Sequence, residues 1–454
     1  MAIKRISYFA IISFLLLIST SNIYSQVGAN VVGSNSAQAN SITLPQGNIY
    51  YCIAASDSEV YPILISNTQN IPTPSPFQQD IAICNGTLNI GSSFAYINNL
   101  TLFNQIDPNG QNVYFVNSSG NILYSWYEGQ LTYNGVTCDV WWVNISNGIP
   151  ANSNVTIYMN IGPNSANYYS QYYPYVGEAP YLSSIYAQYD NGQDVFIAYG
   201  YFNNTLDGWS GYIYQGSFSP TVTPNGIEML NNTGSCMGTY ILPPNNGNIP
   251  KIPLIVEEAW WYTQGADANA ISLFGNTNQQ FNAYGIASPI ISINGCGGTN
   301  VTGGSYNTCG GGTPASNLST YVQFEYWSGV NIPLGQAAML KSAVTDEYLN
   351  YTSFPTSGGT IYSYMFINSS YAQTGYYYYS SNQVLVPLTL LDMYPLSYNS
   401  NYGNYTYYNL NYNPFQYPTL EIGAGQCSPS YQYDEWVVAR AYPPNNIMPS
   451  IYIS

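Results

Sequence analysis

A succession of short apolar runs, each ended by turn-forming residues, limits this chain most strongly to an all-β fold. Runs such as NVYFVNSSGNILYSWYEG, CDVWWVNIS and SNVTIYMNIG are rich in Val, Ile, Tyr and Trp, and Asn, Gly or Pro separates them. β-Branched and aromatic residues suit half-buried strands, whereas Asn, Gly and Pro suit the turns between strands. Residues 334–350 (LGQAAMLKSAVTDEYLN) are the one stretch that favours a helix.

The strictest alternation lies near the carboxyl end, in YQYDEWVVARAYPPN. A period of two predicts that one face of this strand carries Asp434, Trp436, Val438 and Arg440. Trp436 and Val438 are expected in the core. Asp434 and Glu435 are expected to anchor the preceding turn; a structural calcium ion is the alternative, although two carboxylates alone supply few of the oxygens that calcium needs.

The amino-terminal stretch MAIKRISYFAIISFLLLISTSNIYSQ places Lys4 and Arg5 ahead of a long apolar run and then a polar segment. This order is typical of a secretory signal peptide, which we assign to residues 1–25. An uncleaved membrane anchor is the alternative, because Ile23 fits poorly three residues before a cleavage point at Ser25. Either way, the protein is expected to be secreted or held at the cell surface.

Charged residues are scarce and mostly acidic. Five basic residues oppose 21 acidic ones, and only 6% of the chain is charged. Without the signal peptide the basic residues are Lys251, Lys341 and Arg440, so the net charge at pH 7 is 3 − 21 = −18. Such a surface repels nucleic acid and anionic lipid, and neither is an expected partner. In strong acid the carboxylates protonate and the net charge becomes about +3. The magnitude of the charge is then small, which suits an acidic habitat.

Twelve N-x-S/T sequons suggest a glycan-coated surface protein. The alternative is that abundant Asn and Ser produce sequons by chance. The candidate glycosylation sites are Asn85, Asn99, Asn117, Asn144, Asn154, Asn203, Asn231, Asn300, Asn317, Asn350, Asn368 and Asn404.

The cysteines are too few for a dense disulfide scaffold, but an exported chain can oxidise them. Cys296 and Cys309 bracket the Gly-rich loop CGGTNVTGGSYNTC, and a disulfide between them would contribute roughly 3 kcal/mol. Metal binding competes poorly, because the chain has no His and no second close Cys pair. At least one of the other five is expected to be free or paired between chains: Cys52, Cys84, Cys138, Cys236 and Cys427.

The mature length, 454 − 25 = 429 residues, exceeds one β-sandwich and predicts two. We place the linker in SANYYSQYYPYVGEAPYLSS, where Pro174, Gly177 and Pro180 interrupt the alternation, although a buried strand between modules would also be Tyr-rich. The expected divisions are a signal peptide (1–25), a linker (26–44), a small β-sandwich (45–167), a Tyr/Pro linker (168–184), a second β-sandwich (185–447) and a tail (448–454).

The first of these modules resembles the small β-sandwich family known as domain of unknown function 2341. The matching features, in order, are Leu123 and Trp126, Trp142 and Val143, Pro150 to Ser153, and Thr156 to Gly162. The chain departs from that family where its last strand closes with Ile161 and Gly162 instead of a Tyr-Gly pair.

The second module is similar to a concanavalin-like jelly roll of the laminin-G type, which follows the first family in archaeal and bacterial surface proteins. YGYFNNTLDGWSG matches its opening through Phe202, Leu206, Asp207 and Trp209. IPLIVEEAWWYTQ resembles its first long strand, and PTLEIGAGQ and YQYDEWVVARAY resemble its closing pair. The resemblance implies that the last strand returns beside the first, with Arg440 at one of the family's two basic positions.

Little in the sequence indicates catalysis. Without His there is no Ser-His or Cys-His pair and no His-ligated zinc. The Glu-x-Asp-x-x-Glu pattern of jelly-roll glycosidases is missing; Glu257 and Glu258 come nearest, but adjacent strand residues point to opposite faces. EEAWWYTQ is better interpreted as a core strand with one exposed aromatic residue, which could stack on a sugar.

We therefore predict a secreted or surface-attached protein that recognises or adheres to glycans or other cell-surface components, without enzymatic activity and without a required cofactor. A structural component of a cell envelope or extracellular filament, joined by strands or by a free Cys, is the second hypothesis. A glycan-active enzyme is the third. The ligand-binding residues are not predicted.

Overall fold

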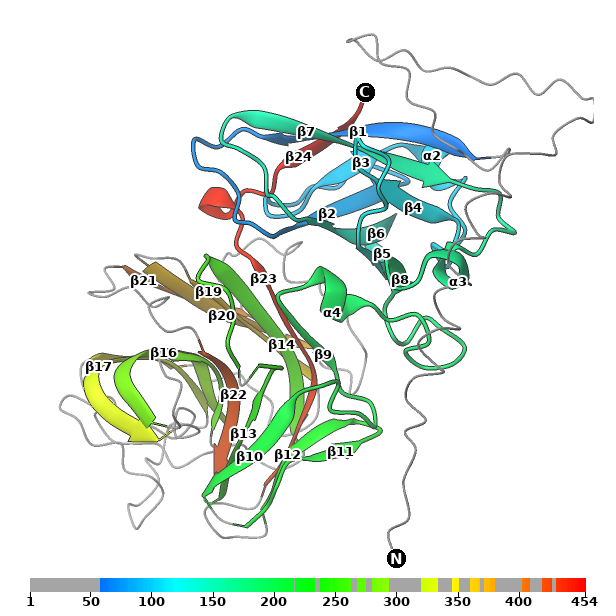
Figure 1. The fold of residues 1–454 in the computed structure, drawn as a ribbon. Coiled ribbons are helices and arrows are strands. Elements are labelled where there is room, and N and C mark those ends of the chain that lie inside the picture. The colour runs from blue at the N-terminus through cyan, green and yellow to red at the C-terminus, as the bar shows by residue number, and fades with distance from the viewer. Residues whose placement is uncertain are drawn as a thin grey trace, which may run out of the picture. The chain divides into compact units, whose positions relative to one another are not determined.

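The structure is a computed structural model that describes residues 58–215, 217–232, 237–245, 247–262, 268–274, 280–293, 320–333, 345–350, 360–367, 371–379, 402–408, 419–426 and 430–454. The predicted signal peptide and the linker at 26–44 lie outside these residues, as do Cys296 and Cys309. The described chain is built mainly from strands with a few single-turn helices, which confirms the all-β class (Figure 1).

The first module is a sandwich of a four-stranded and a five-stranded sheet. The four-stranded sheet has the order β24 (Ser450–Ile453), β1 (Glu59–Asn67), β7 (Ser153–Ile161) and β4 (Val113–Val116). The five-stranded sheet has the order β3 (Tyr96–Asn98), β2 (Phe77–Cys84), β6 (Val136–Ile145), β5 (Ser125–Tyr133) and β8 (Val176–Glu178). Short helices α2 (Leu100–Phe103), α3 (Tyr168–Tyr172) and α4 (Gly192–Val195) lie in the connections.

The β5–β6 hairpin shows how turn chemistry sets the register. The strands are joined by Asn134 and Gly135, whose φ angles are 49° and 81°. Two consecutive left-handed residues form the turn that matches the twist of paired strands, and Asn-Gly is the sequence that tolerates it best. The turn pairs Tyr133 with Val136 and Thr132 with Thr137, and a bulge at Glu128 of β5 then shifts the register by one residue so that Trp126 pairs with Trp142.

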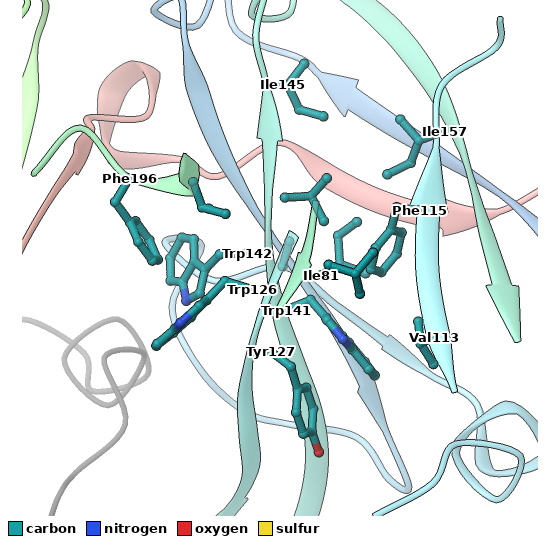
Figure 2. Close-up of a cluster of buried hydrophobic side chains, with 14 of the residues drawn as sticks. Ile81, Val113, Phe115, Trp126, Tyr127, Trp141, Trp142, Ile145, Ile157 and Phe196 are labelled. Atoms are coloured by element: carbon teal, nitrogen blue, oxygen red, sulfur yellow. The ribbon is translucent and has the colours of Figure 1, made fainter. Parts of the chain in front are cut away.

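Strand β6 is buried on both faces, which explains why VWWV reads as a continuous apolar run. Trp141 contacts Phe115 and Tyr127, with ring centroids 6.0 and 4.9 Å apart, inside the sandwich. Trp142 points the other way, against Phe196 at 5.9 Å. Figure 2 shows these two groups of aromatic side chains on opposite sides of the strand. Arg440 lies over the Trp142 ring, 4.8 Å from its centroid, so the second face is also covered.

The second module contains a seven-stranded and an eight-stranded sheet. The first has the order β10 (Ser210–Gln215), β13 (Met237–Leu242), β22 (Thr419–Gln426), β15 (Ala268–Phe274), β16 (Gln280–Ile293), β17 (Thr320–Pro333) and β18 (Thr345–Asn350). The second has the order β11 (Thr221–Thr223), β12 (Gly226–Asn232), β23 (Ser430–Ala441), β14 (Leu254–Tyr262), β19 (Thr360–Ile367), β20 (Tyr371–Tyr379) and β21 (Tyr402–Tyr408). An eighth strand, β9 (Ala198–Tyr201), also pairs with β23.

The connections of the second module are those of a jelly roll. The consecutive strands β12 and β13 lie in different sheets, and so do β22 and β23; β12 pairs with β23, and β13 with β22. The chain is thus a doubled ribbon folded over one core, which includes Val256, Val437 and Ile422. The first strand of the module, β9, pairs with β23, as expected for a closing strand that returns beside the opening one.

The alternation predicted for β23 is wrong at one position. Ala259 pairs with Trp436 but its neighbour Trp260 pairs with Asp434, so β23 carries a bulge at Glu435. The extra residue shifts the side-chain period, and Asp434 lies on the face opposite to Trp436. Trp436 and Val438 are fully buried, as expected.

Two segments expected between or after the modules belong to the first sandwich. The stretch 168–184 contains α3 and β8, and β8 pairs in parallel with β5. The expected tail contains β24, which pairs antiparallel with β1 and brings Ile451 opposite Ile65. Ile451 is buried, so apolar burial holds the strand in place. The expected helix is also wrong where it is described, because residues 345–350 form β18 against β17.

One disulfide joins Cys84 and Cys138, two of the five residues for which no partner was predicted. The two residues lie directly opposite each other on β2 and β6, with their Cα atoms 4.0 Å apart. Facing positions on neighbouring antiparallel strands are close enough for a disulfide, but a separation of 54 residues gives no sequence signal.

Candidate functional site

Trp261 and Tyr433 form a stacked aromatic pair on the eight-stranded sheet. They are directly opposite on β14 and β23, with ring centroids 4.1 Å apart and planes within 11° of parallel. Both side chains are half-buried, in contrast to the neighbouring Trp260, which is fully buried. Trp261 is therefore more exposed than Trp260, in line with the expectation of an exposed aromatic residue in EEAWWYTQ.

Each of the two rings donates a hydrogen bond to a neighbouring polar group. The Tyr433 hydroxyl donates to Glu228 Oε1 at 3.0 Å, and Trp261 Nε1 donates to the Asn225 carbonyl at 3.2 Å. Glu228 lies opposite Tyr433 on β12, so the three side chains form one row across the sheet. Asn231 Nδ2 donates to the same Glu228 oxygen at 3.2 Å. We call Trp261, Tyr433, Glu228 and Asn231 the aromatic platform.

The electrostatics of the aromatic platform keep Tyr433 neutral. Burial, followed by the hydrogen bond to Glu228, raises the pKa of Tyr433 to about 12. The phenol therefore stays a hydrogen-bond donor over the physiological pH range. The platform thus offers two rigid aromatic rings, a carboxylate with a second oxygen and a side-chain amide.

Glu257 and Glu258 do not form a catalytic pair. Both are fully buried. Glu257 pairs with Arg440, whose Nε donates to Oε2 at 3.0 Å, so the basic residue of the closing strand makes a buried ion pair. Glu257 lies opposite Val438 and Glu258 opposite Val437, and those two valines belong to different cores. The two carboxyl groups therefore point to opposite faces, as the alternation predicted.

Asp434 and Glu435 lie within β23 and not at the preceding turn, contrary to expectation. Both are buried, and desolvation raises the pKa of each carboxyl well above its usual range. No group of three or more His, Cys, Asp or Glu side chains that could hold a metal ion occurs in the described part of the chain. The two carboxyls have the environment of buried, protonated groups.

Neutral donors hold two carboxyl groups of the first module, those of the half-buried Asp190 and the fully buried Asp139. Asp190 Oδ1 accepts from Trp126 Nε1 at 3.0 Å, from the Tyr199 hydroxyl at 2.8 Å and from the Gly192 amide at 3.1 Å. Asp139 Oδ1 accepts from a tyrosine hydroxyl at 2.6 Å. Burial is the main cause that raises the pKa of Asp190 and of Asp139 to about 7.

The Asn side chains of the sequons differ in solvent exposure and in whether their amide nitrogen makes a hydrogen bond. Asn85 and Asn154 are exposed. Asn144 is half-buried, and its Nδ2 donates to the carbonyls of Asp194 and Val195 at 3.3 and 3.4 Å. Asn99, Asn117, Asn203 and Asn231 are partly buried. The remaining candidates lie outside the residues whose side chains are described: Asn300, Asn317, Asn350, Asn368 and Asn404.

No family model matches the chain. "Uncharacterized protein 562" of Sulfolobus islandicus rod-shaped virus 1 is 35% identical over 207 residues, which span 43% of this chain and 32% of that relative. The match thus covers about a third of the relative's length.

Several solved lectin structures align with about half of the chain. The Lotus tetragonolobus seed lectin aligns with 54% of this chain and 98% of its own, at 10% identity and a TM-score of 0.31. Lectin I from Ulex europaeus aligns with 53% and 95%, at 10% identity and a TM-score of 0.32. The Emp46p carbohydrate recognition domain aligns with 54% and 96%, at 6% identity and a TM-score of 0.30. Similarity at this level assigns no ligand.

Among the residues that the structure describes, no helix has the length and apolar character needed to cross a membrane.

The sequence indicated one member of the aromatic platform and missed the rest. EEAWWYTQ was interpreted as a core strand with one exposed aromatic residue, since adjacent residues on a strand point to opposite faces. Tyr433 and Glu228 carried no such signal, since they are distant in the chain and meet only through the pairing of β12 and β14 with β23.

Proposed function

We propose that this protein is an exported recognition or adhesion protein whose second module binds a neutral glycan at the aromatic platform without cleaving it. The observation that carries the proposal is the stacked, half-buried pair of Trp261 and Tyr433. Export rests on the signal-like residues 1–25.

The geometry of the pair suits the apolar face of a sugar ring. Large aromatic side chains contribute contact area with little loss of conformational freedom, and here each ring is already held by its neighbour and by a hydrogen bond. Pre-organised rings lower the entropic cost of binding.

The polar groups beside the rings suit sugar hydroxyls. Glu228 Oε1 accepts from Tyr433 and Asn231, and the carboxylate has a second oxygen, Oε2, that is able to accept from a sugar hydroxyl. Carboxylate and amide oxygens accept from hydroxyls without any positive charge on the ligand. Affinity should therefore depend little on salt, unlike recognition of sulfated glycans.

The positions of Glu257 and Glu258 support the absence of cleavage. A glycosidase needs two carboxyl groups on either side of one bond. Glu257 and Glu258 lie on opposite faces of β14 and are buried, so they do not flank a common ligand.

The test is a glycan array followed by calorimetry on mature full-length protein, with Trp261→Ala as the perturbing variant. Truncating a central aromatic contact should weaken binding by about 10-fold or more. Tyr212→Ala is the matched control, because Tyr212 stacks on Tyr240 at 5.1 Å on the other sheet of the same module. An equal loss of affinity in both variants, or a loss only in Tyr212→Ala, would show that the aromatic platform is not the binding site. Released sugars in a parallel incubation would contradict the absence of cleavage.

A further inference from the structure

A second group of aromatic side chains lies on the first module. Tyr124 and Tyr175 are stacked with centroids 4.8 Å apart, and Tyr173 meets Tyr189 at 6.3 Å. Tyr173 is 49% exposed and Tyr175 is 44% exposed. With the exposed Asp194 of α4, these four residues form what we call the tyrosine surface.

Backbone contacts fix the parts of the tyrosine surface relative to one another. The Asn144 amide donates to the Tyr124 carbonyl at 2.9 Å, and Asn144 Nδ2 donates to the Asp194 carbonyl at 3.3 Å. The Ser125 amide donates to the Tyr175 carbonyl at 2.9 Å. Asp194 and the stacked tyrosines are therefore held next to each other by one residue of β6 and the first residue of β5.

The tyrosine surface has negative electrostatic character. The faces of aromatic rings carry a negative quadrupole, and Asp194 adds a carboxylate beside them. The Tyr173 hydroxyl donates to the backbone carbonyl of Asp190 at 3.1 Å, which holds that ring in place. Within the part of the chain that the structure describes, the hydrogen bonds and ring contacts of these tyrosines and of Asp194 involve no basic side chain.

The same protein shows which group such a surface suits. Arg440 lies 4.8 Å from the centre of the Trp142 ring while its Nε donates to Glu257 at 3.0 Å. A planar guanidinium can stack on a ring and pair with a carboxylate at once, which an ammonium does less well. The tyrosine surface offers exposed rings and a carboxylate, the two partners that Arg440 has in the interior.

We propose that the tyrosine surface binds an arginine-bearing segment of a partner protein. The guanidinium stacks on Tyr173 or Tyr175 and pairs with Asp194. The large excess of acids over bases, 21 against 5, favours approach of a cationic segment over an acidic one.

The test uses two peptides that differ at two positions: one has two arginines separated by uncharged residues, and the other has citrulline at both positions. Their binding to mature full-length protein is measured at low and at physiological salt. Citrulline keeps the planar shape and most of the donors but removes the charge. The arginine peptide should bind more tightly by about 10-fold, and the difference should shrink as salt rises.

Variants assign the binding to the surface. Tyr175→Leu should weaken the arginine peptide about 3-fold, and Tyr175→Phe should restore it, because a cation–π contact needs the ring and not the hydroxyl. Asp194→Asn should weaken it about 3-fold as well. The matched controls are Tyr452→Leu, which removes a tyrosine that is 53% exposed on β24, and Glu59→Gln, which removes an exposed acid on β1.

Three results would overturn the proposal. Equal binding of the citrulline peptide would show that the positive charge is not recognised. Equal weakening by Glu59→Gln and Asp194→Asn shows general attraction to an acidic protein. Competition at Tyr175 by a neutral oligosaccharide makes the surface a glycan site instead. Unchanged thermal unfolding of each variant guards against misfolding as the cause.

Discussion

Raising the pH from 4 to 8 should destabilise this protein, and Asp190 supplies a measurable part of the effect. Burial is the largest of the causes that raise the pKa of Asp190 to about 7, against an ordinary value of 3.8. In the unfolded chain Asp190 releases its proton near pH 4, whereas in the folded chain it holds the proton until about pH 7. The folded state thus binds more protons in this range, and the free energy of unfolding falls as pH rises.

The magnitude follows from the difference in pKa. About 3 pH units at 1.36 kcal/mol per unit give roughly 4 kcal/mol, which is fully present below pH 4 and lost by pH 7. Local relaxation and water entry reduce it, so we expect about 2 to 4 kcal/mol. Asp139, whose pKa is also raised to about 7, adds a loss of the same sign.

Asp190→Asn isolates this contribution. An amide oxygen can accept the bonds from Trp126 Nε1 and the Gly192 amide, and the amide nitrogen in the place of Oδ2 can donate to the Tyr199 hydroxyl. The variant imitates the protonated acid at every pH. It should match the natural protein near pH 4 and exceed its stability at pH 8.

The assay is denaturant unfolding followed by Trp fluorescence at five pH values, with Glu59→Gln as a control that removes an exposed acid. General charge repulsion also grows with pH, so the informative quantity is the difference in slope between Asp190→Asn and the natural protein. Equal slopes between pH 4 and 7, or a slope that the exposed control changes as much, would refute the reasoning.

Further predictions concern the chain's connections. Protease should cut near Ile185, which is 65% exposed, yet the two fragments should stay together without denaturant, because β24 remains in the first sandwich; prompt separation on a sizing column would contradict this. Peptide mapping without reduction should recover Cys84 bonded to Cys138, and replacing both with Ala should lower stability by up to about 4 kcal/mol; free thiols at both sites would show the bond is absent. Mass spectrometry of native protein should find glycan on Asn154 before Asn144, whose amide is engaged; the reverse order would show that local unfolding decides modification.

Local sequence patterns predicted the class of the fold because strand propensity and turn residues act over a few positions. The Asn134-Gly135 turn and the VWWV run of β6 are examples: each fixes a strand or a hairpin without help from distant residues. The closing strand was predicted for the same reason, since its β-branched and aromatic residues favour a strand, and Trp436 and Val438 are buried as expected.

Features that depend on distant pairing were not predictable. The bulge at Glu435 arises where β14 and β23 come into register, and β24 reaches the first sandwich from almost 300 residues beyond β7. The platform depends on three strands that meet only in the folded protein. A single sequence shows which residues prefer strands, but register and neighbour order come from the whole core.

The pairing of β24 with β1 covers a sheet edge only after the last strand of the second module has been made. Synthesis runs from the amino end, so the strand β1 exists long before Ser450–Ile453 are made. Until then, residues 63–66 have an open sheet edge, the kind of edge that recruits other chains or proteases. A molecule that lacks Ser450–Ile453 keeps that edge exposed, whereas one that has this strand covers it. A protease or chaperone that binds open sheet edges would therefore act on the first and not on the second.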